Sequence, residues 1–498
     1  MSAVVPSPVT RRNAVVCLSL IAAFVLALTL HGYLSRPTLD RYGDMYENYA
    51  WGALWQWGYF KHPPFFGWET AAWFLVFPRT DFWYFLLAGV NAGAALLALW
   101  RIAARFGGTG FQVMVLTFAM LMPPVSFLGL NFNANAAMTP LWAALFLFYL
   151  RGLEQKKLLD AALIGVFAAF SMLTKYHSAV MLGALLIHAL TDREARSLLF
   201  STFGLVAAAV FLAVMAPHFY WLYQNDFLPI TYAAHQDDGV GANLYDMFRF
   251  VISPIGYCAL AILVARCMRD FRDPYPVLPL SEVKGLRRSV TGRALIAFAV
   301  WPMVLTVVLG YAANAELSAV WGIPFHTPYA VIIALLVPAA YYEIRMKRAI
   351  GAAALFMAII IGIAPIWYRF ELRKDVAYYN APLSQLAEEV DRRWAAAGGS
   401  KRPLIFGEYA LANPVSFYSR FDPLTLEDDS FEISKNYITL ESAKKRGMIG
   451  LCLEPNGGCN AVVKAAIPAT VGSETFSLPG HQPGVTWTYR IWLLPPQP

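Results

Sequence analysis

The sequence has few charged residues. Only 14% of its 498 residues are Asp, Glu, Lys or Arg, and 58% are hydrophobic, whereas about 25% of an average soluble domain is charged. The mean hydropathy is +0.49. This balance excludes an ordinary soluble enzyme and is typical of a chain that crosses a membrane several times.

Several common site signatures are also missing. The chain has no Cys-x-x-Cys pair, no His-x-x-x-His spacing and no glycine-rich phosphate loop. We therefore expect no cofactor, although the residues alone leave a divalent metal open. The net charge of +7 does not indicate nucleic-acid binding, because much of the Lys and Arg lies in short runs between apolar stretches, where it sets membrane topology.

Eleven apolar stretches approach the roughly 20 residues that a helix needs to cross a bilayer. They cover residues 15–34, 82–100, 111–130, 134–150, 160–174, 177–190, 198–217, 249–266, 294–312, 327–343 and 350–367. The fifth and sixth are short and weakly separated, which leaves a re-entrant pair open. Arg11 and Arg12 precede the first stretch and predict a cytoplasmic N-terminus.

The distribution of Lys and Arg supports this alternation. The later outer segments, 218–248 and 313–326, hold neither residue, whereas the segments predicted to be cytoplasmic are basic. The first outer loop, 35–81, breaks the rule, since it carries Arg36, Arg41, Lys61 and Arg79. Charges placed against the topological bias are candidates for function.

The C-terminal part has the composition of a soluble domain. The sequence predicts a transmembrane domain over 1–367 and a soluble domain over 368–498, on the same outer side as the first loop because the number of spans is odd. Within it, apolar residues at helical spacing predict a helix over 382–397, and 403–406 reads as a strand. The expected fold is an α-helical polytopic membrane protein with a C-terminal periplasmic α/β domain.

A disulfide is expected in the soluble domain. Cys452 and Cys459 flank a Pro-Asn-Gly-Gly turn. If the domain lies outside the cytoplasm, this spacing favours a bond between them.

The first outer loop is long, charged and aromatic. Between Arg41 and Pro64 it holds seven Tyr and Trp side chains, which suit a membrane–water interface. Asp44 and Glu47 are three residues apart and would share one face of a helix. A carboxylate beside a partly dry surface has the raised pKa that suits a general base. The alternative is an interfacial helix with solvated acids.

Lys61-His62-Pro63-Pro64 closes the same loop. The two prolines hold His62 in an extended conformation, so that Lys61 and His62 could bind a phosphate at the membrane surface. The alternative is a rigid turn that ends an interfacial helix.

Lys175-Tyr176-His177 interrupts an apolar stretch. An ionisable residue at membrane depth is a functional candidate, and Lys175 could neutralise a lipid phosphate. The alternative is a lysine that extends to the interface from a helix end.

Further substrate contacts are expected from polar and aromatic residues of the outer loops, while the His235-Gln-Asp-Asp run lacks metal-ligand spacing. These candidates are Tyr59, His218, Trp221, Glu316, Trp321 and His326.

The motifs resemble, in chain order, those of the bacterial GT-C glycosyltransferases, which are relatives of the dolichyl-phosphate-mannose protein mannosyltransferases, the lipid A aminoarabinose transferase and the rhizobial lipopolysaccharide galacturonosyltransferases. Asp44, followed eighteen residues later by His62-Pro-Pro, looks like their first outer loop. Leu173-Thr-Lys-Tyr176 is similar to their Leu-Ser-Lys-Tyr motif. Ala412-Asn-Pro-Val-Ser-Phe-Tyr418 resembles a segment of their outer domain.

The resemblance implies an enzyme of the bacterial inner membrane. Such an enzyme moves a sugar, with inversion, from a polyprenyl phosphate to an acceptor hydroxyl of lipid A, lipopolysaccharide or another glycolipid on the periplasmic face. By motif position Asp44 would be the general base, and Lys175 with Tyr176 would hold the donor phosphate. Lys61 and His62 would assist near the leaving group. No metal is required if lysine does this.

Three positions depart from the motif. Met45 stands where a second acid is usual, so that Glu47 is its possible replacement, and Lys61 stands where an acid is frequent. Glu316 has no counterpart in the motif. These departures concern the substrate more than the reaction. A protein acceptor, a secondary transporter and a non-catalytic scaffold stay as alternatives, although no internal repeat of the kind that transporters show is visible.

Overall fold

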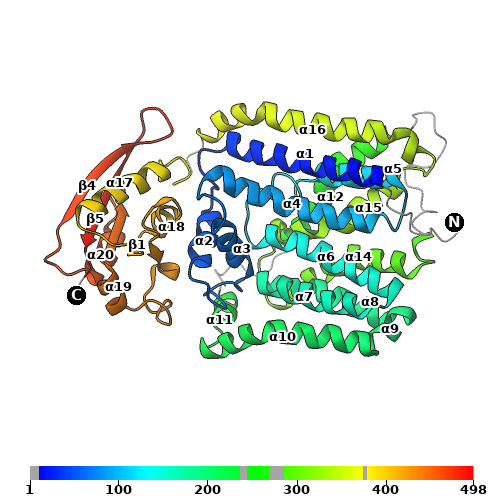
Figure 1. Cartoon of the computed structure of the whole chain (residues 1–498), viewed down its shortest axis with the longest axis horizontal. Helices are drawn as coiled ribbons and strands as arrows, with labels where there is room; N and C mark the ends of the chain where they lie inside the picture. Colours follow the sequence, from blue (N-terminus) through cyan, green and yellow to red (C-terminus); the bar gives the residue numbers. More distant parts are fainter. Residues whose placement is uncertain (1–10, 236–243, 270–284, 374–377, 497–498) are drawn as a thin grey trace. The chain divides into compact units, whose positions relative to one another are not determined.

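The structure is a computed structural model that describes residues 11–235, 244–269, 285–373 and 378–496. These residues form two compact units (Figure 1). The helical unit consists of Met1–Leu30, Lys61–Pro63 and Leu86–Gly362. The loop–sheet unit consists of His31–Phe60, Pro64–Phe85 and Ile363–Pro498. Most of the first outer loop therefore folds with the C-terminal region.

The expected apolar stretches form helices, and the prediction of a polytopic helical membrane protein is confirmed. Seven described helices are long and apolar enough to span a membrane: α1 (Arg11–Ser35), α4 (Asp81–Ala103), α6 (Ala134–Gln155), α10 (Thr202–Gln224), α12 (Leu244–Cys267), α14 (Val290–Ala312) and α16 (Tyr341–Glu371). Shorter apolar helices are α5 (Thr109–Met120), α7 (Leu158–Thr174), α8 (Ala179–Thr191) and α15 (His326–Leu335). In Figure 1 the long helices α4, α6 and α10 of the helical unit run in roughly the same direction.

Several predicted boundaries are wrong. The stretch 327–343 is helical in α15 only to Leu335, and α16, which contains the stretch 350–367, begins at Tyr341. The stretch 111–130 is helical only to Met120, because the chain turns at Pro123-Pro124, where proline disfavours a continuing helix. The stretch 198–217 continues as α10 to Gln224. His218 and Trp221 therefore lie on a membrane helix and not in the outer loop. Asp237 and Asp238 fall outside the described residues.

Short elements connect these helices. They are η1 (Tyr176–Ser178), α9 (Arg193–Leu199), α11 (Leu228–His235) and η2 (Ala319–Phe325). In the first outer loop the chain forms α2 (Asp44–Gly52) and α3 (Phe65–Phe74), which pack closely. Added side-chain atoms at Gly52 would fall 2.1 Å from the carbonyl oxygen of Gly67, so this approach requires glycine.

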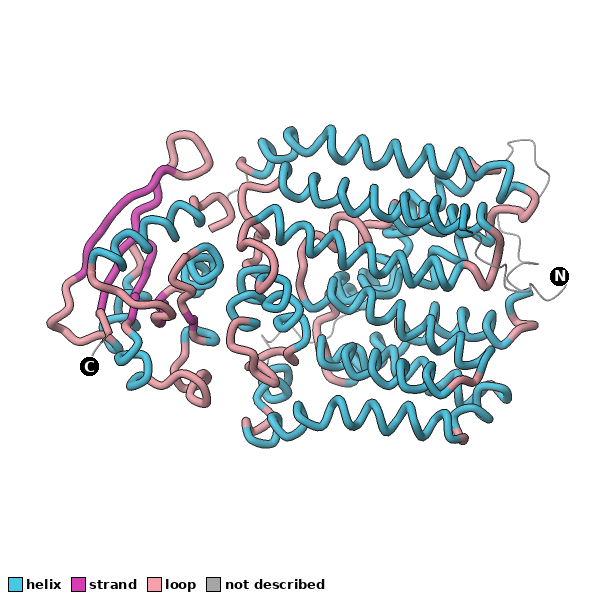
Figure 2. The backbone as a smooth tube through the Cα atoms, viewed as in Figure 1, coloured by secondary structure: helices cyan, strands magenta, loops and turns pink. Residues whose placement is uncertain are grey.

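The C-terminal region builds one mixed five-stranded sheet, drawn in magenta in Figure 2. Its strands are β1 (Leu404–Gly407), β2 (Leu424–Thr425), β3 (Met448–Leu453), β4 (Ser473–Pro479) and β5 (Thr486–Leu494), in the order β2-β1-β3-β5-β4. β1 pairs in parallel with β2 and β3, whereas β5 is antiparallel to β3 and β4. The expected strand at 403–406 is β1, which is buried along its whole length.

Four helices and one turn complete the sheet region: α17 (Leu383–Ala396), η3 (Glu427–Asp429), α18 (Tyr409–Tyr418), α19 (Leu440–Arg446) and α20 (Gly457–Ala466). α17 is the expected amphipathic helix, since it buries Leu383, Leu386, Val390 and Trp394. A disulfide joins Cys452 at the end of β3 to Cys459 in α20, and both sulfurs belong to the core of the sheet region.

Candidate active site

Lys175 lies in a break between two apolar helices of the helical unit. α7 ends at Thr174, and the backbone of Lys175 is extended before the turn η1. The ammonium group donates a hydrogen bond of 2.8 Å to Oδ1 of Asn135 and lies 5.3 Å from the centre of the Trp321 ring. The charge is thus held by an amide and a cation–π contact, which explains how the cation is tolerated in an apolar region.

Asn135 brings the amino end of α6 to this lysine. Asn133 caps the helix by accepting hydrogen bonds from the backbone N–H groups of Asn135 and Ala136. A helix amino end carries a partial positive charge. A cation and a helix amino end therefore meet at one place, an arrangement that suits an anionic group.

Lys61 and His62 belong to the same unit and are half-buried. Burial, together with the positive charges of Lys175 and Lys61, holds the pKa of His62 well below its usual value. His62 is accordingly neutral at pH 7, and its ring can donate one hydrogen bond and accept another. The two lysines are thus within electrostatic range of one imidazole.

A second group surrounds Tyr176. Its hydroxyl is 2.9 Å from Nε2 of His218, which is fully buried. The His218 ring is nearly parallel to Trp221, with centres 6.1 Å apart. His218 and Trp221 are on α10. Through the contact with His218, this helix holds Tyr176, the residue that follows Lys175 in the break between α7 and α8.

The other expected contacts are placed differently. Trp321 lies against His177 as well as Lys175, with ring centres 5.5 Å apart. His326 is 3% exposed, and its Nδ1 is 2.9 Å from the carbonyl oxygen of Ile323, so it caps its own turn. Glu316 is exposed. Trp321 is therefore the member of this set that the structure brings to Lys175.

The candidate base lies at the start of α2 in the loop–sheet unit. Asp40 holds this helix start: its carboxylate accepts hydrogen bonds from the backbone N–H groups of Tyr42, Asp44 and Met45 at 2.8, 3.2 and 2.8 Å. Gly43 has φ +82°, in the left-handed region that favours glycine. Asp40 was not predicted from the sequence, although an Asp a few residues before a helix is a known capping signal.

The three carboxylates of this loop, Asp40, Asp44 and Glu47, differ in solvent exposure. Asp40 is 3% exposed and Glu47 is 5% exposed, whereas Asp44 is half-buried. Glu47 accepts a hydrogen bond from the hydroxyl of Tyr409. Asp44 is thus the most exposed acid of the three.

Tyr59, which the sequence placed among the substrate contacts, lies in the protein core. Its ring is fully buried and stacks on Trp51, with centres 5.2 Å apart and an angle of 25°. Its neighbour Phe60 donates its backbone N–H to Oε2 of Glu427 at 2.6 Å. Tyr59 therefore packs in the core that holds α2 instead of lining a surface.

The ionisation of Asp40 should be visible in the stability of the protein. Burial and the negative charge of Asp44 raise the pKa of Asp40 from 3.8 to about 6. A raised carboxyl pKa means that the folded protein binds this proton more tightly than the unfolded chain, so the free energy of unfolding falls as the pH rises from about 4 to about 6. Asp40→Asn removes this component, which amounts to about 3 kcal/mol at most.

The measurement is the unfolding temperature of both proteins at pH 4.5 and pH 7.5. We expect the unfolding temperature of Asp40→Asn, relative to that of the wild type, to be higher at pH 7.5 than at pH 4.5. A difference that is the same at both values would contradict this assignment.

Among the described residues, no group of three or more His, Cys, Asp and Glu side chains is arranged to hold a metal ion.

The family profile described as dolichyl-phosphate-mannose-protein mannosyltransferase matches residues 61–221. This match begins at Lys61, includes Lys175 and ends at Trp221. Among curated relatives, the lipid A galacturonosyltransferase RgtD of Rhizobium johnstonii is 25% identical over 349 residues, which are 64% of this chain and 72% of RgtD. The lipopolysaccharide core galacturonosyltransferase RgtB of the same organism is 27% identical over 181 residues, 34% of either chain.

A solved structure covers nearly the whole molecule. The crystal structure of ArnT from Cupriavidus metallidurans bound to undecaprenyl phosphate matches with a TM-score of 0.64 and 11% identity, over 98% of this chain and 100% of ArnT. Its apo form matches with a TM-score of 0.63. This chain is thus a membrane-embedded protein with the GT-C fold. The family profile, the relatives and this fold together support a GT-C superfamily glycosyltransferase.

Proposed function

We propose that this protein transfers a sugar from a polyprenyl phosphate to a hydroxyl group of lipid A or another lipopolysaccharide component. The observation that carries the proposal is the Lys175 site, where a cation lies at a helix amino end within electrostatic range of His62. The relatives RgtD and RgtB, named for lipid A and lipopolysaccharide core, support the acceptor class. The undecaprenyl phosphate bound to ArnT supports the donor class.

In the proposed reaction, the carboxylate of Asp44 accepts the proton of the acceptor hydroxyl. The oxygen of that hydroxyl forms a bond to the anomeric carbon, and the bond from this carbon to the phosphate oxygen breaks. The electron pair leaves with the phosphate, and the anomeric configuration inverts. Lys175, assisted by Lys61 and the N–H of His62, stabilises the charge that develops on the phosphate.

The family profile, named for protein mannosyltransferases, favours a second candidate acceptor, a protein hydroxyl. The test of both is a transfer assay with the purified full-length protein in lipid nanodiscs. Polyprenyl-phosphate-linked sugars are offered together with lipid A, with core lipopolysaccharide or with periplasmic protein, and the products are weighed by mass spectrometry. We expect one sugar-sized mass on a lipid acceptor and none with Asp44→Asn.

Transfer to protein but to neither lipid would show that the acceptor is a protein hydroxyl and not a lipopolysaccharide component. The control is cooperative unfolding, which shows that the purified protein is folded. If a folded protein transfers sugar from none of the donors, the proposal is contradicted.

We further propose that the protein resides in the bacterial inner membrane with its N-terminus in the cytoplasm and residues 368–498 in the periplasm. A dual reporter fused after Pro498 should show alkaline phosphatase activity, which requires the periplasm, and no fluorescence from a cytoplasmic reporter. Fluorescence without phosphatase activity would contradict this orientation.

A further inference from the structure

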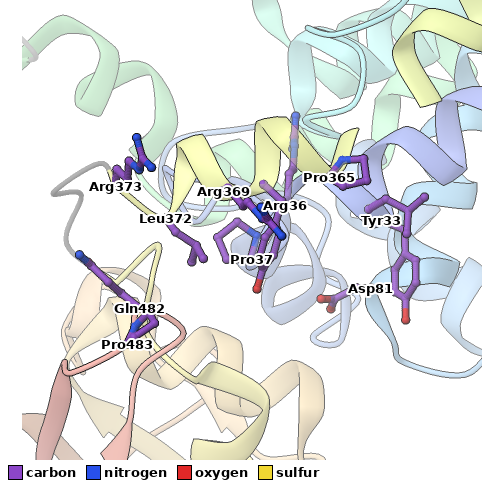
Figure 3. A pocket seen from close by; sticks show the side chains of 12 residues that line it. Tyr33, Arg36, Pro37, Asp81, Pro365, Arg369, Leu372, Arg373, Gln482 and Pro483 are labelled. Carbon is purple, nitrogen blue, oxygen red and sulfur yellow. The ribbon is translucent and has the colours of Figure 1, made fainter. Parts of the chain in front are cut away.

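A large cavity of the loop–sheet unit has no part in the reaction proposed above. Its volume is about 900 Å³, and every residue that lines it belongs to this unit. It lies beside the last residues of α1 and α16 and is completed by Asp81 and by the β4–β5 loop at Gln482 and Pro483 (Figure 3). None of Lys61, His62 and Lys175 lines it, so it is chemically separate from the proposed donor-phosphate site.

The polar lining of the cavity is basic. Arg36, Arg369 and Arg373 carry three positive charges, and Asp81 is the acid among the lining residues. Arg369 and Arg373 are exposed, and neither forms an ion pair with another described residue. A guanidinium group binds the oxygens of a phosphate through two parallel hydrogen bonds. The lining therefore suits a phosphate group.

The surroundings of the arginines are apolar. Tyr33 and Leu34 at the end of α1 are 49% and 40% exposed, and Ile366 and Phe370 on α16 are 70% and 53% exposed. Both helices are membrane-spanning candidates. Arginines at the end of such helices, next to exposed apolar side chains, match a molecule with a charged head and hydrocarbon chains.

Arg36 connects the cavity to the loop of the candidate base. Its guanidinium donates a hydrogen bond of 2.9 Å to the carbonyl oxygen of Leu39. It is also within electrostatic range of Asp40 and of Glu371, and Asp40 is in turn within range of Asp44. An anion in the cavity would therefore act on the segment that positions Asp44.

We propose that this cavity binds the phosphate of an anionic bilayer phospholipid. The headgroup lies among the three arginines, and the acyl chains follow the exposed apolar side chains at the ends of α1 and α16, among them Leu34 and Phe370. The lipid is a structural ligand, and it undergoes no reaction.

The test uses the full-length protein in nanodiscs that contain phosphatidylcholine with phosphatidylglycerol as the probe, and native mass spectrometry counts the lipids retained. The variant Arg369→Gln/Arg373→Gln leaves Arg36 and its hydrogen bond in place. Near a membrane surface each basic residue contributes about fivefold in lipid affinity, so we expect about a 25-fold loss of the preference for phosphatidylglycerol. The control is Arg420→Gln, since Arg420 is an exposed arginine of the same unit that does not line the cavity.

We also expect phosphatidylglycerol to raise the unfolding temperature of the wild type and of Arg420→Gln, but not that of the double variant. Equal retention of both lipids by the wild type would overturn the proposal, as would an unchanged preference in the double variant. When lipid A is added to the same nanodiscs, retention of lipid A but not of phosphatidylglycerol would assign the cavity to another occupant and also overturn the proposal. Because no transfer is measured, the result is independent of the proposed function.

Discussion

Asp44→Asn will abolish sugar transfer and leave the protein folded. Asparagine has nearly the same shape as aspartate but cannot accept the proton of the acceptor hydroxyl, and a positioned general base contributes about 10²- to 10⁴-fold in rate. The half-buried position of Asp44 at the start of α2 allows this exchange without a cavity. The measurement is kcat with saturating donor and acceptor, together with the unfolding temperature.

Glu47→Gln is the matched control. Glu47 is on the same helix and accepts a hydrogen bond from Tyr409, which the oxygen of glutamine can also accept. We expect this variant to retain most of its activity. If Glu47→Gln is inactive and Asp44→Asn is active, the roles of the two acids are exchanged, and Glu47 replaces the acid that Met45 leaves missing.

Lys175→Met should reduce kcat/KM for the polyprenyl-phosphate donor by about 10²-fold or more, with an increase in the donor KM. Lys175 is half-buried, so water screens its charge less than in bulk, and its ammonium group stabilises the departing phosphate. Methionine keeps the apolar character of the side chain beside Trp321 but removes the cation–π contact with that ring. The measurement is the donor dependence of the rate at fixed acceptor.

Lys175→Arg preserves the charge and should lose less, while Lys157→Met removes an exposed lysine outside the site and should leave the donor KM unchanged. If Lys175→Met has the donor KM and the rate of the wild type, the lysine only extends to the interface from the end of α7. In that case the phosphate is held elsewhere.

The helical part of the fold could be predicted from the sequence because apolar runs report burial in a bilayer directly. Each of the eleven stretches contains a described helix. The ends were harder to predict: Pro123-Pro124 ended α5 early, while α10 continued through Pro217 and carried His218 into the helix. A proline that breaks one helix is tolerated inside another when neighbouring helices support it, and a single sequence does not show these neighbours.

The candidate site was predictable only as separate pieces. Lys175 stood out because it interrupts an apolar run, but Asn135 and Trp321, which hold it, lie far away in sequence. No local pattern reports such contacts. Asp40 was missed for a different reason, since its capping role becomes visible only once the start of α2 is known.

Mass spectrometry of the outer-envelope lipids tests the central claim most directly. Three strains are compared: one with the wild-type protein, one lacking it and one carrying Asp44→Asn. We predict that the second and third strains lose the same sugar-sized mass from lipopolysaccharide, while the Asn variant is present in the membrane at the wild-type level. Identical lipid profiles in all three strains would contradict the assignment of this protein as a lipopolysaccharide glycosyltransferase.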